Sequence, residues 1–396
     1  MKSLFKWNER LVKAWGLLPA KPGDILGTEL TPQYRIAAKS GYGSFSTVWM
    51  ARDLVAGTMV AVKLVQALET PTSREAAILE HLSASESSDA PRFSSANGIH
   101  QLLEGLAFID GRGIAHGANC SHSEHVNLYP RNIGVVVPEF DKFSKVDIWC
   151  LGGQPDLVPL VTEGLVPAHL THALNLGKFL LDEVPGFVAR EQRVRILDFG
   201  CAFFAQDAPC FPCTVPIIYA APEVFFPRTA RGDKHAPWDR RSDVWSFACV
   251  MGATALDPKS IPHAALTRRG HLFHDGQEFL NRMARFYDGA PDEWMEYFAS
   301  VSDAGPPKRV HRLLFYPNLK RGANDCIAYT FKAEDAFWAA SAKAFQKAGQ
   351  SVEDARGVVG LLRRMLVINP TRRPTAAELL LDSYLARRDV SVGPSG

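Results

Sequence analysis

The chain has 396 residues, of which 46% are hydrophobic and 10% aromatic, as in a packed globular protein with room for two lobes or domains. Its 44 basic and 42 acidic residues leave a net charge of +2, which excludes binding to nucleic acid or membrane surfaces by bulk charge. Seven scattered cysteines, an odd number, argue for a reducing compartment and against a disulfide framework, so we expect a cytoplasmic or nuclear protein. We also expect the protein to act as a monomer.

The first half of the chain predicts a small β-rich part. Residues 1–32 are predicted to be an N-terminal extension. Its basic, amphipathic start is either an organelle-targeting helix or, as the favoured interpretation, a helical extension that packs on the domain or frays. Residues 34–65 alternate apolar residues with glycine-rich turns and predict three antiparallel strands. The stretch "TSREAAILEHL" follows a proline and has apolar residues at helical spacing, so it predicts one helix.

A glycine-rich turn lies between the first two of these strands. In "GYGSF", Gly41 and Gly43 lie between strand-like runs, which disfavours a dinucleotide fold and favours a hairpin whose backbone N–H groups cover phosphates. Glycine in a hairpin is most often only a turn. The signal is stronger because Val48 follows where a base would pack, and Lys63 in "VAVKL" lies at a distance suited to phosphates.

Glu75 opens the predicted helix and has two interpretations. It is either a first-turn acid that favours the helix dipole or the partner of Lys63 in an ion pair that orients the ammonium.

After a polar stretch, the chain changes to helical patterns and predicts a larger helical part. The patterns are "IHQLLEGLAFIDGRG", "SDVWSFACVMGAT", "QEFLNRMARFYDG", "PDEWMEYFA", "EDAFWAASAKAFQKAG" and "VEDARGVVGLLRRML".

The most specific short signal is "RILDFG" at 195–200. An apolar strand brings Asp198 to a turn, where its carboxylate can bind Mg²⁺ and Gly200 permits a sharp bend. Farther on, Glu223 in "AAPEV" and Arg373 in "NPTRRPT" are either ordinary surface charges or a buried, structural ion pair. Asp243 in "SDVWSF" lies near a helix start.

In this order and spacing, the motifs "GYGSFSTVW", "VAVK", "PRN", "DFG", "APE", "DVWS" and "NPTRRPT" resemble those of eukaryotic protein kinases. Within that superfamily, "GDILGTELTPQYRI" and "DFGCAF" resemble the serine/arginine-rich-protein kinases in their diverged fungal form. The resemblance implies a two-lobed α+β fold, with a small β-rich lobe and a larger helical lobe, and transfer of phosphate from ATP to serine or threonine. It places nucleotide contacts at Gly41, Gly43, Val48, Ala61 and Lys63, metal ligands at Asn132 and Asp198, and a catalytic ion pair at Lys63 and Glu75.

The resemblance also implies domain bounds and partners. We expect an incomplete small lobe at 33–96, a large lobe at 97–388 with a spacer-like insertion at about 136–194, and a tail at 389–396. The spacer reads as a loop with one short helix. The implied partners are Mg²⁺, ATP and protein substrates rich in Arg and Ser.

Two departures from the kinase pattern stand out. Only about a dozen residues separate "EHLSA" from "NGIH", where roughly 40 are needed for two strands, an adenine-binding connector and a helix. We therefore expect a sheet of three strands without most of that connector.

The second departure is the catalytic loop. "GIAHG" resembles the beginning of that loop and "NLYPRN" its end, but residues 118–126 between them have no counterpart. The kinase histidine is then either His116 or His125, and either choice puts Asn127 where a catalytic aspartate is expected. His116, His122 and His125 are irregularly spaced, which favours an exposed polar loop over a metal cluster.

These departures leave two functional hypotheses open. The chain is a serine/threonine kinase with altered activity, or it is a pseudokinase that binds partners. An error of splicing or gene prediction would account for both departures at once.

Overall fold

The computed structural model describes residues 20–28, 31–42, 46–66, 74–84, 98–117, 132–137, 140, 157–159, 169–174, 193–207, 219–224, 238–256, 335 and 338–390. Its contacts divide the chain into two compact units. One comprises 1–76 with 136–189, and the other comprises 77–135 with 190–396. The predicted lobe bounds differ from this division, because they gave 77–96 to the first lobe and the spacer to the second.

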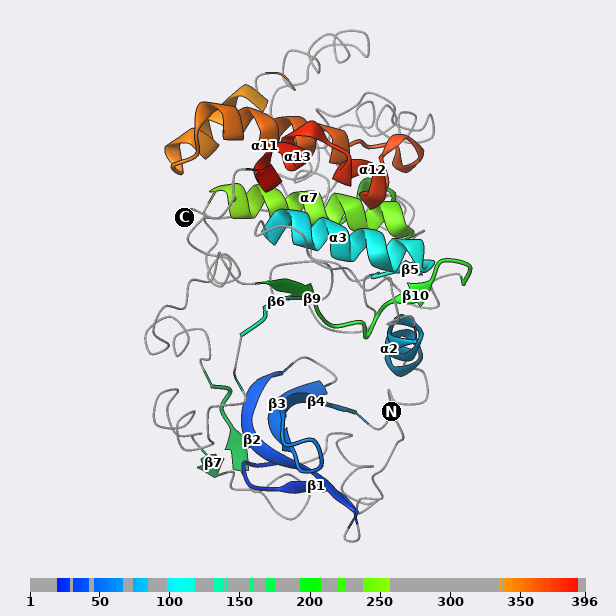
Figure 1. Ribbon diagram of the computed structural model, residues 1–396, viewed down its shortest axis with the longest axis vertical. Coiled ribbons are helices and arrows are strands. Elements are labelled where there is room, and N and C mark those ends of the chain that lie inside the picture. The colour runs from blue at the N-terminus through cyan, green and yellow to red at the C-terminus, as the bar shows by residue number, and fades with distance from the viewer. Residues whose placement is uncertain are drawn as a thin grey trace, which may run out of the picture. The chain divides into compact units, whose positions relative to one another are not determined.

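The first unit is built on an antiparallel sheet in the order β1-β2-β3-β4 (Figure 1). Its strands are β1 (Ile25–Gly27), β2 (Pro32–Tyr42), β3 (Ser46–Asp53) and β4 (Met59–Val65). The last three are the predicted strands, but the predicted number of three is wrong because β1 adds a fourth. With only three residues between turns, β1 is too short to show the alternation that identifies a strand.

The two faces of this sheet are covered differently. Trp49, Ala51, Val62 and Leu64 share one face and are buried in a cluster with Leu26 and Ile36. On the opposite face, Ala38 and Met50 are buried with Leu174, and Met59 and Phe140 pack against them.

The segment 136–189 also contributes an antiparallel pair to this unit, formed by β7 (Leu157–Pro159) and β8 (His169–Thr171). The sequence predicted no strands there. The helix predicted for the spacer lies outside the described residues.

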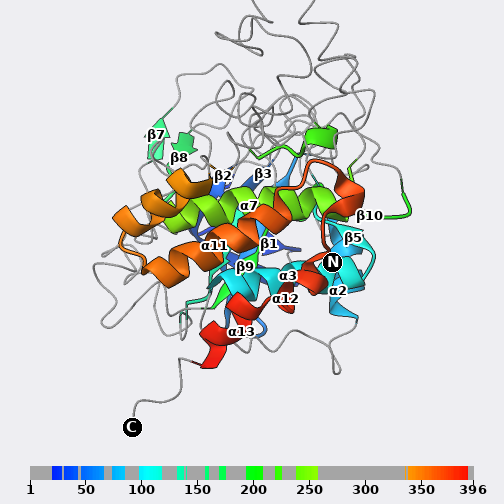
Figure 2. The same cartoon turned by 90° about the horizontal axis from the view of Figure 1, so that it is seen from above.

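The second unit is mainly helical. Its helices include α2 (Glu75–Ser83), of which residues 77–83 belong to it, α3 (Gly98–Gly111), α7 (Arg240–Leu256), α11 (Val352–Met365), α12 (Ala376–Leu380) and α13 (Ser383–Val390), with a short 3₁₀ turn at Pro370–Arg372. In Figure 1, α7 lies between α3 and α11, and Figure 2 shows the three running alongside one another. Residues 338–347 are also helical.

Caps and apolar spacing explain the best-defined helices. Ser351 caps α11 by accepting from the backbone N–H of Asp354, and Thr375 forms a capping box with Glu378 at α12. Leu103 of α3, Trp245 of α7 and Leu362 of α11 are fully buried in one core.

Short strand pairs lie beside these helices. β5 (Ile114–Ala115) pairs with β10 (Phe203–Phe204), and β6 (Ile133–Val135) pairs with β9 (Val194–Ile196). The α+β class is therefore confirmed, with a β-rich unit and a helical unit. The predicted helices in 277–299 lie outside the described residues. No described helix has both the length and the apolar character that a membrane crossing requires.

Two glycines of α11 make a matched test of its packing. A Cβ at Gly357 would lie 2.0 Å from the ring of buried Tyr384, whereas a Cβ at Gly360 would meet no atom within 4 Å. We expect Gly360→Ala to raise the free energy of unfolding by about 0.5–1 kcal/mol, through helix propensity alone. Gly357→Ala should lower it by about 1–3 kcal/mol because the ring must move. Urea denaturation checks both, and equal effects of the two substitutions would contradict the packing of α13 on α11.

Candidate functional site

The candidate nucleotide residues of the first unit share one face of its sheet. Gly41 of β2 pairs with Val48 of β3, and Val48 pairs with Lys63 of β4, so the three lie in a row across the strands. Ala61, two residues before Lys63, points to the same side. A Cβ at Gly41 would meet no atom within 4 Å, which leaves its backbone accessible. Gly43 lies outside the described residues.

Lys63 is paired with Glu75 at the end of this row. Its Nζ donates to both carboxylate oxygens, at 3.1 Å to Oε1 and 2.9 Å to Oε2. The side chains are 27% and 14% exposed, so the pair is partly screened but not free in water. Glu75 is the first residue of α2, and the ion-pair interpretation of Glu75 therefore holds in the structure.

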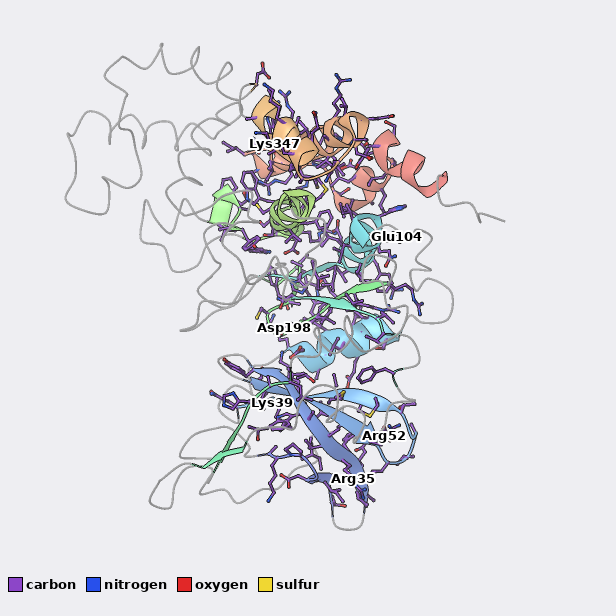
Figure 3. The ribbon with its side chains drawn as sticks, turned by 90° about the vertical axis from the view of Figure 1, so that its left-hand side faces the viewer. Arg35, Lys39, Arg52, Glu104, Asp198 and Lys347 are labelled. Atoms are coloured by element: carbon purple, nitrogen blue, oxygen red, sulfur yellow. The ribbon has the colours of Figure 1, made fainter. Side chains whose placement is uncertain are left out.

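The candidate metal ligands of the second unit lie at one end of the β6–β9 ladder. The backbone carbonyl of Asn132 accepts from the N–H of Leu197 at 2.7 Å, and Asp198 follows directly. Asn132 is buried, and Figure 3 labels Asp198 on the loop after β9. The ladder therefore brings the two candidate ligands together, as the kinase pattern implies.

Asp198 also has an unusual backbone. Its φ is +62°, and among the described residues it is the one position other than glycine with a positive φ. Aspartate tolerates this left-handed region better than most residues, and such conformations gather at functional sites. Its Oδ1 accepts from the N–H of Gly200 at 3.4 Å, which closes the tight turn.

The side chains of Asp198 and Asn132 carry oxygen atoms of the kind that bind Mg²⁺. The carboxylate of Asp198 and the amide oxygen of Asn132 are hard oxygen ligands. In the described part of the chain, no three His, Cys, Asp or Glu side chains gather into a metal site. That donor set fits Mg²⁺, which proteins bind through one or two carboxylates together with substrate phosphates.

The structure places His116 beside the "DFG" turn. The Nε2 atom of His116 lies 3.0 Å from the carbonyl oxygen of Leu197, and its ring meets Phe199 edge to face at 5.2 Å. His125 lies outside the described residues, as does Asn127. The expectation of an exposed loop is wrong for His116, which is fully buried because β5 carries it into the core.

The side chain of Asp243 fixes the backbone at His116. Its carboxylate accepts from the backbone N–H of His116 at 2.7 Å and of Gly117 at 3.2 Å, and from the Trp238 indole at 3.1 Å. Burial raises the pKa of Asp243 to about 7, against the effect of these three donors. Burial also lowers the pKa of His116, so its ring is neutral at pH 7.

Gly117 is required where it stands. Its φ is +73°, and a Cβ there would come within 2.6 Å of the carbonyl oxygen of Cys201. The chain after the "DFG" turn therefore packs directly against the backbone that leads into the catalytic loop.

The predicted ion pair of Glu223 and Arg373 is present and buried. The guanidinium donates to both carboxylate oxygens, at 2.8 and 3.1 Å, and the Arg373 side chain is 0% exposed. Arg373 also donates to the carbonyls of Val367 and Arg241, and Ser242 donates to Glu223.

Sequence reasoning missed Ser242 and Trp238 as partners of these carboxylates. Ser242 precedes Asp243 by one residue and Trp238 precedes it by five. No local sequence pattern distinguishes such a hydrogen-bond partner from an ordinary residue at a helix start.

Removing one member of the buried pair should be costly. We expect Arg373→Met to lower the free energy of unfolding by about 3–5 kcal/mol, because it leaves the Glu223 carboxylate buried without its cation. Adding Glu223→Gln should recover part of this loss. Arg363→Met is the matched control, since Arg363 pairs with Asp335 at the surface and should matter by less than about 1 kcal/mol. Urea denaturation measures all three, and equal losses for Arg373→Met and Arg363→Met would contradict the prediction.

The buried Asp243 predicts a pH dependence. Its pKa of about 7 lies above the ordinary 3.8, so between these pH values the folded state binds more protons than the unfolded state. The contribution of Asp243 to the free energy of unfolding therefore falls as pH rises from about 4 to about 7. The Asp243→Asn variant lacks this pH-dependent contribution to the free energy of unfolding. The variant and the wild type both retain the contribution of His116.

The measurement is urea denaturation of both proteins at several pH values. The stability of the wild type relative to Asp243→Asn should fall from about pH 5 to about pH 7 and stay level above about pH 8. A difference that is constant with pH would contradict it.

Comparison with known proteins finds distant sequence relatives among protein kinases. No protein-family profile matches the chain. The chain is 24% identical over 342 residues to cyclin-dependent kinase 4 of Xenopus laevis, covering 78% of this chain and 93% of the relative. It is 25% identical over 226 residues to a probable serine/threonine-protein kinase, PknB, of Corynebacterium glutamicum, covering 56% of this chain and 31% of the relative.

A solved kinase-domain structure aligns with 93% of this chain and 99% of its own length, at 18% identity and a TM-score of 0.49. The narrower resemblance to serine/arginine-rich-protein kinases stays a prediction. The two sequence relatives support the predicted relationship of the chain to the protein kinase superfamily.

Proposed function

We propose that the chain is a protein serine/threonine kinase that transfers the γ-phosphate of ATP, bound with Mg²⁺, to protein substrates. The observation that carries the proposal is the ion pair of Lys63 and Glu75, on the same sheet face as Gly41 and Val48. A lysine held by a carboxylate in this way presents a fixed ammonium to phosphate oxygens. The names of the two sequence relatives agree with this reaction class.

Each residue then has a stated role. Lys63 neutralises phosphate charge, and Glu75 fixes its direction. Asp198 and Asn132 hold Mg²⁺, which supplies neutralisation of the charge that develops on the phosphates. His116 holds the turn that carries Asp198, through Leu197 and Phe199.

The amide side chain of Asn127 determines the rate of phosphate transfer that we expect. Its amide oxygen can accept a hydrogen bond from a substrate hydroxyl, but the amide does not take up the proton at neutral pH. Positioned general-base catalysis contributes about 10²- to 10⁴-fold to rate. We therefore propose a kinase with a low rate of transfer, for which serines in Arg/Ser-rich segments are the substrates that the sequence resemblance suggests.

A pseudokinase is the second candidate, and the amide at position 127 is the observation that favours it. In that case the chain binds Mg²⁺ and ATP, or a protein partner, without transferring phosphate.

The proposal is tested by phosphate transfer from radiolabelled ATP to an Arg/Ser-repeat peptide. We expect slow transfer by the wild type and a gain of about 10²- to 10⁴-fold in Asn127→Asp, because a carboxylate accepts the proton. Lys63→Met and Asp198→Asn should abolish transfer in both backgrounds. Asparagine at 198 keeps the tolerance for positive φ, so this variant removes the charge without adding backbone strain.

Lys39→Met is the matched control. Lys39 lies on β2 of the same sheet (Figure 3), but its ammonium stacks on the rings of Tyr42 and Trp49. Its loss should leave transfer unchanged. No thermal shift of the wild type at millimolar ATP with Mg²⁺ would contradict the proposal. Binding without any gain in Asn127→Asp would favour the pseudokinase.

A further inference from the structure

The sheet face that carries Lys63 is only half covered. Met50 is 6% exposed and lies under Leu174, whereas Ala61 is exposed and Val48 is half-buried. Met50 pairs with Ala61 across the ladder, so the covered and open halves adjoin. The opposite face is closed by its own apolar cluster.

The covering residues come from far along the chain. The backbone N–H of Leu174 donates to the carbonyl oxygen of Lys39 at 2.9 Å. Ile36 still exchanges backbone hydrogen bonds with Gly23 and Asp24, just before β1. Beyond Ile36, the printed ladder of β2 is with β3, so the Lys39 carbonyl lies on a strand edge. The hydrogen bond fixes Leu174 at that edge, and its side chain reaches Ala38 and Met50. Phe140 packs against the same cluster.

We propose that Leu174 and Phe140 form an apolar wall beside the purine base of ATP. The inference rests on the proposed function and assigns base recognition to residues of the 136–189 segment. The open half between Lys63 and Met50 is apolar at Val48 and Ala61 and ends in a cation. That order suits a purine next to the apolar wall with its phosphates toward Lys63.

The chemistry of the wall is dispersion and exclusion of water. A purine presents a flat apolar ring, and its burial against aliphatic and aromatic side chains is favourable. Leu174 does not occupy the open half itself, because Ala61 beside Met50 remains exposed. Leu174 therefore borders the base and does not displace it.

The test compares two probes, ATP and inorganic tripolyphosphate, each with Mg²⁺, by isothermal titration calorimetry. Tripolyphosphate has the phosphates without the base. We expect Leu174→Ala to weaken ATP binding by about tenfold and to leave tripolyphosphate binding unchanged. Phe140→Ala should do the same, and this residue is only partly buried, so the variant is expected to fold. Lys63→Met should weaken both probes.

Leu64→Ala is the matched control, because Leu64 is 7% exposed and Leu174 is 8% exposed, yet Leu64 faces the opposite side of the sheet. It should leave both affinities unchanged.

Wild-type protein that binds ATP, with the same or tighter ATP binding in both wall variants, would overturn the inference alone. Equal losses for ATP and tripolyphosphate would also overturn it, since a base wall cannot act on phosphate. Wild-type protein that binds neither probe would overturn the proposed function and the wall together.

Discussion

The arrangement of the second unit depends on one buried carboxylate. Asp243, in the first turn of α7, accepts N–H groups from His116, Gly117 and Trp238. A buried carboxylate needs such donors, and the backbone that supplies them is thereby fixed. The ring of His116 contacts the Leu197 carbonyl oxygen, so Asp243 also helps to position the turn that follows Leu197. The position of Asp198, a candidate metal ligand, is thus influenced by a helix to which the proposed chemistry assigns no contact with metal or nucleotide.

Two of the ion pairs in the described residues, Lys63–Glu75 and Arg373–Glu223, differ in their burial and in what they can do. Arg373 is fully buried, and its guanidinium is shared among Glu223 and several carbonyls, so the pair is locked in one geometry. Lys63 is partly exposed and directs its hydrogen bonds to Glu75. An ammonium that keeps access to water can exchange part of its bonding for a phosphate, whereas a saturated guanidinium cannot. The buried pair of Arg373 and Glu223 therefore stabilises the fold, whereas the partly exposed pair of Lys63 and Glu75 is suited to bind a phosphate.

Several contacts among the candidate site residues could be predicted from the sequence. Lys63, Glu75, Asp198, Glu223 and Arg373 stand in short motifs whose order along the chain implies their pairing, and the strand and helix periodicities around them are clear. The choice between His116 and His125 could not be made from the sequence, because both follow plausible loop starts. The packing of His116 on Phe199 is a tertiary contact that no local pattern shows. The strand at Ile25–Gly27 and the packing of Leu174 on Met50 were also missed, since each depends on contacts distant in sequence.

The glycine at position 117 has a consequence for how this chain varies. Cys201 and Phe203 lie against this residue, and its backbone N–H donates to Asp243. The backbone is therefore fixed at position 117, directly before the loop that begins at residue 118. Asn132 is fixed separately by the ladder to Leu197. The hydrogen bonds that fix Gly117 and Asn132 are made to Asp243 and Leu197, outside residues 118–131. A change in the length of the loop between Gly117 and Asn132 can therefore leave these hydrogen bonds and the turn at Asp198 in place.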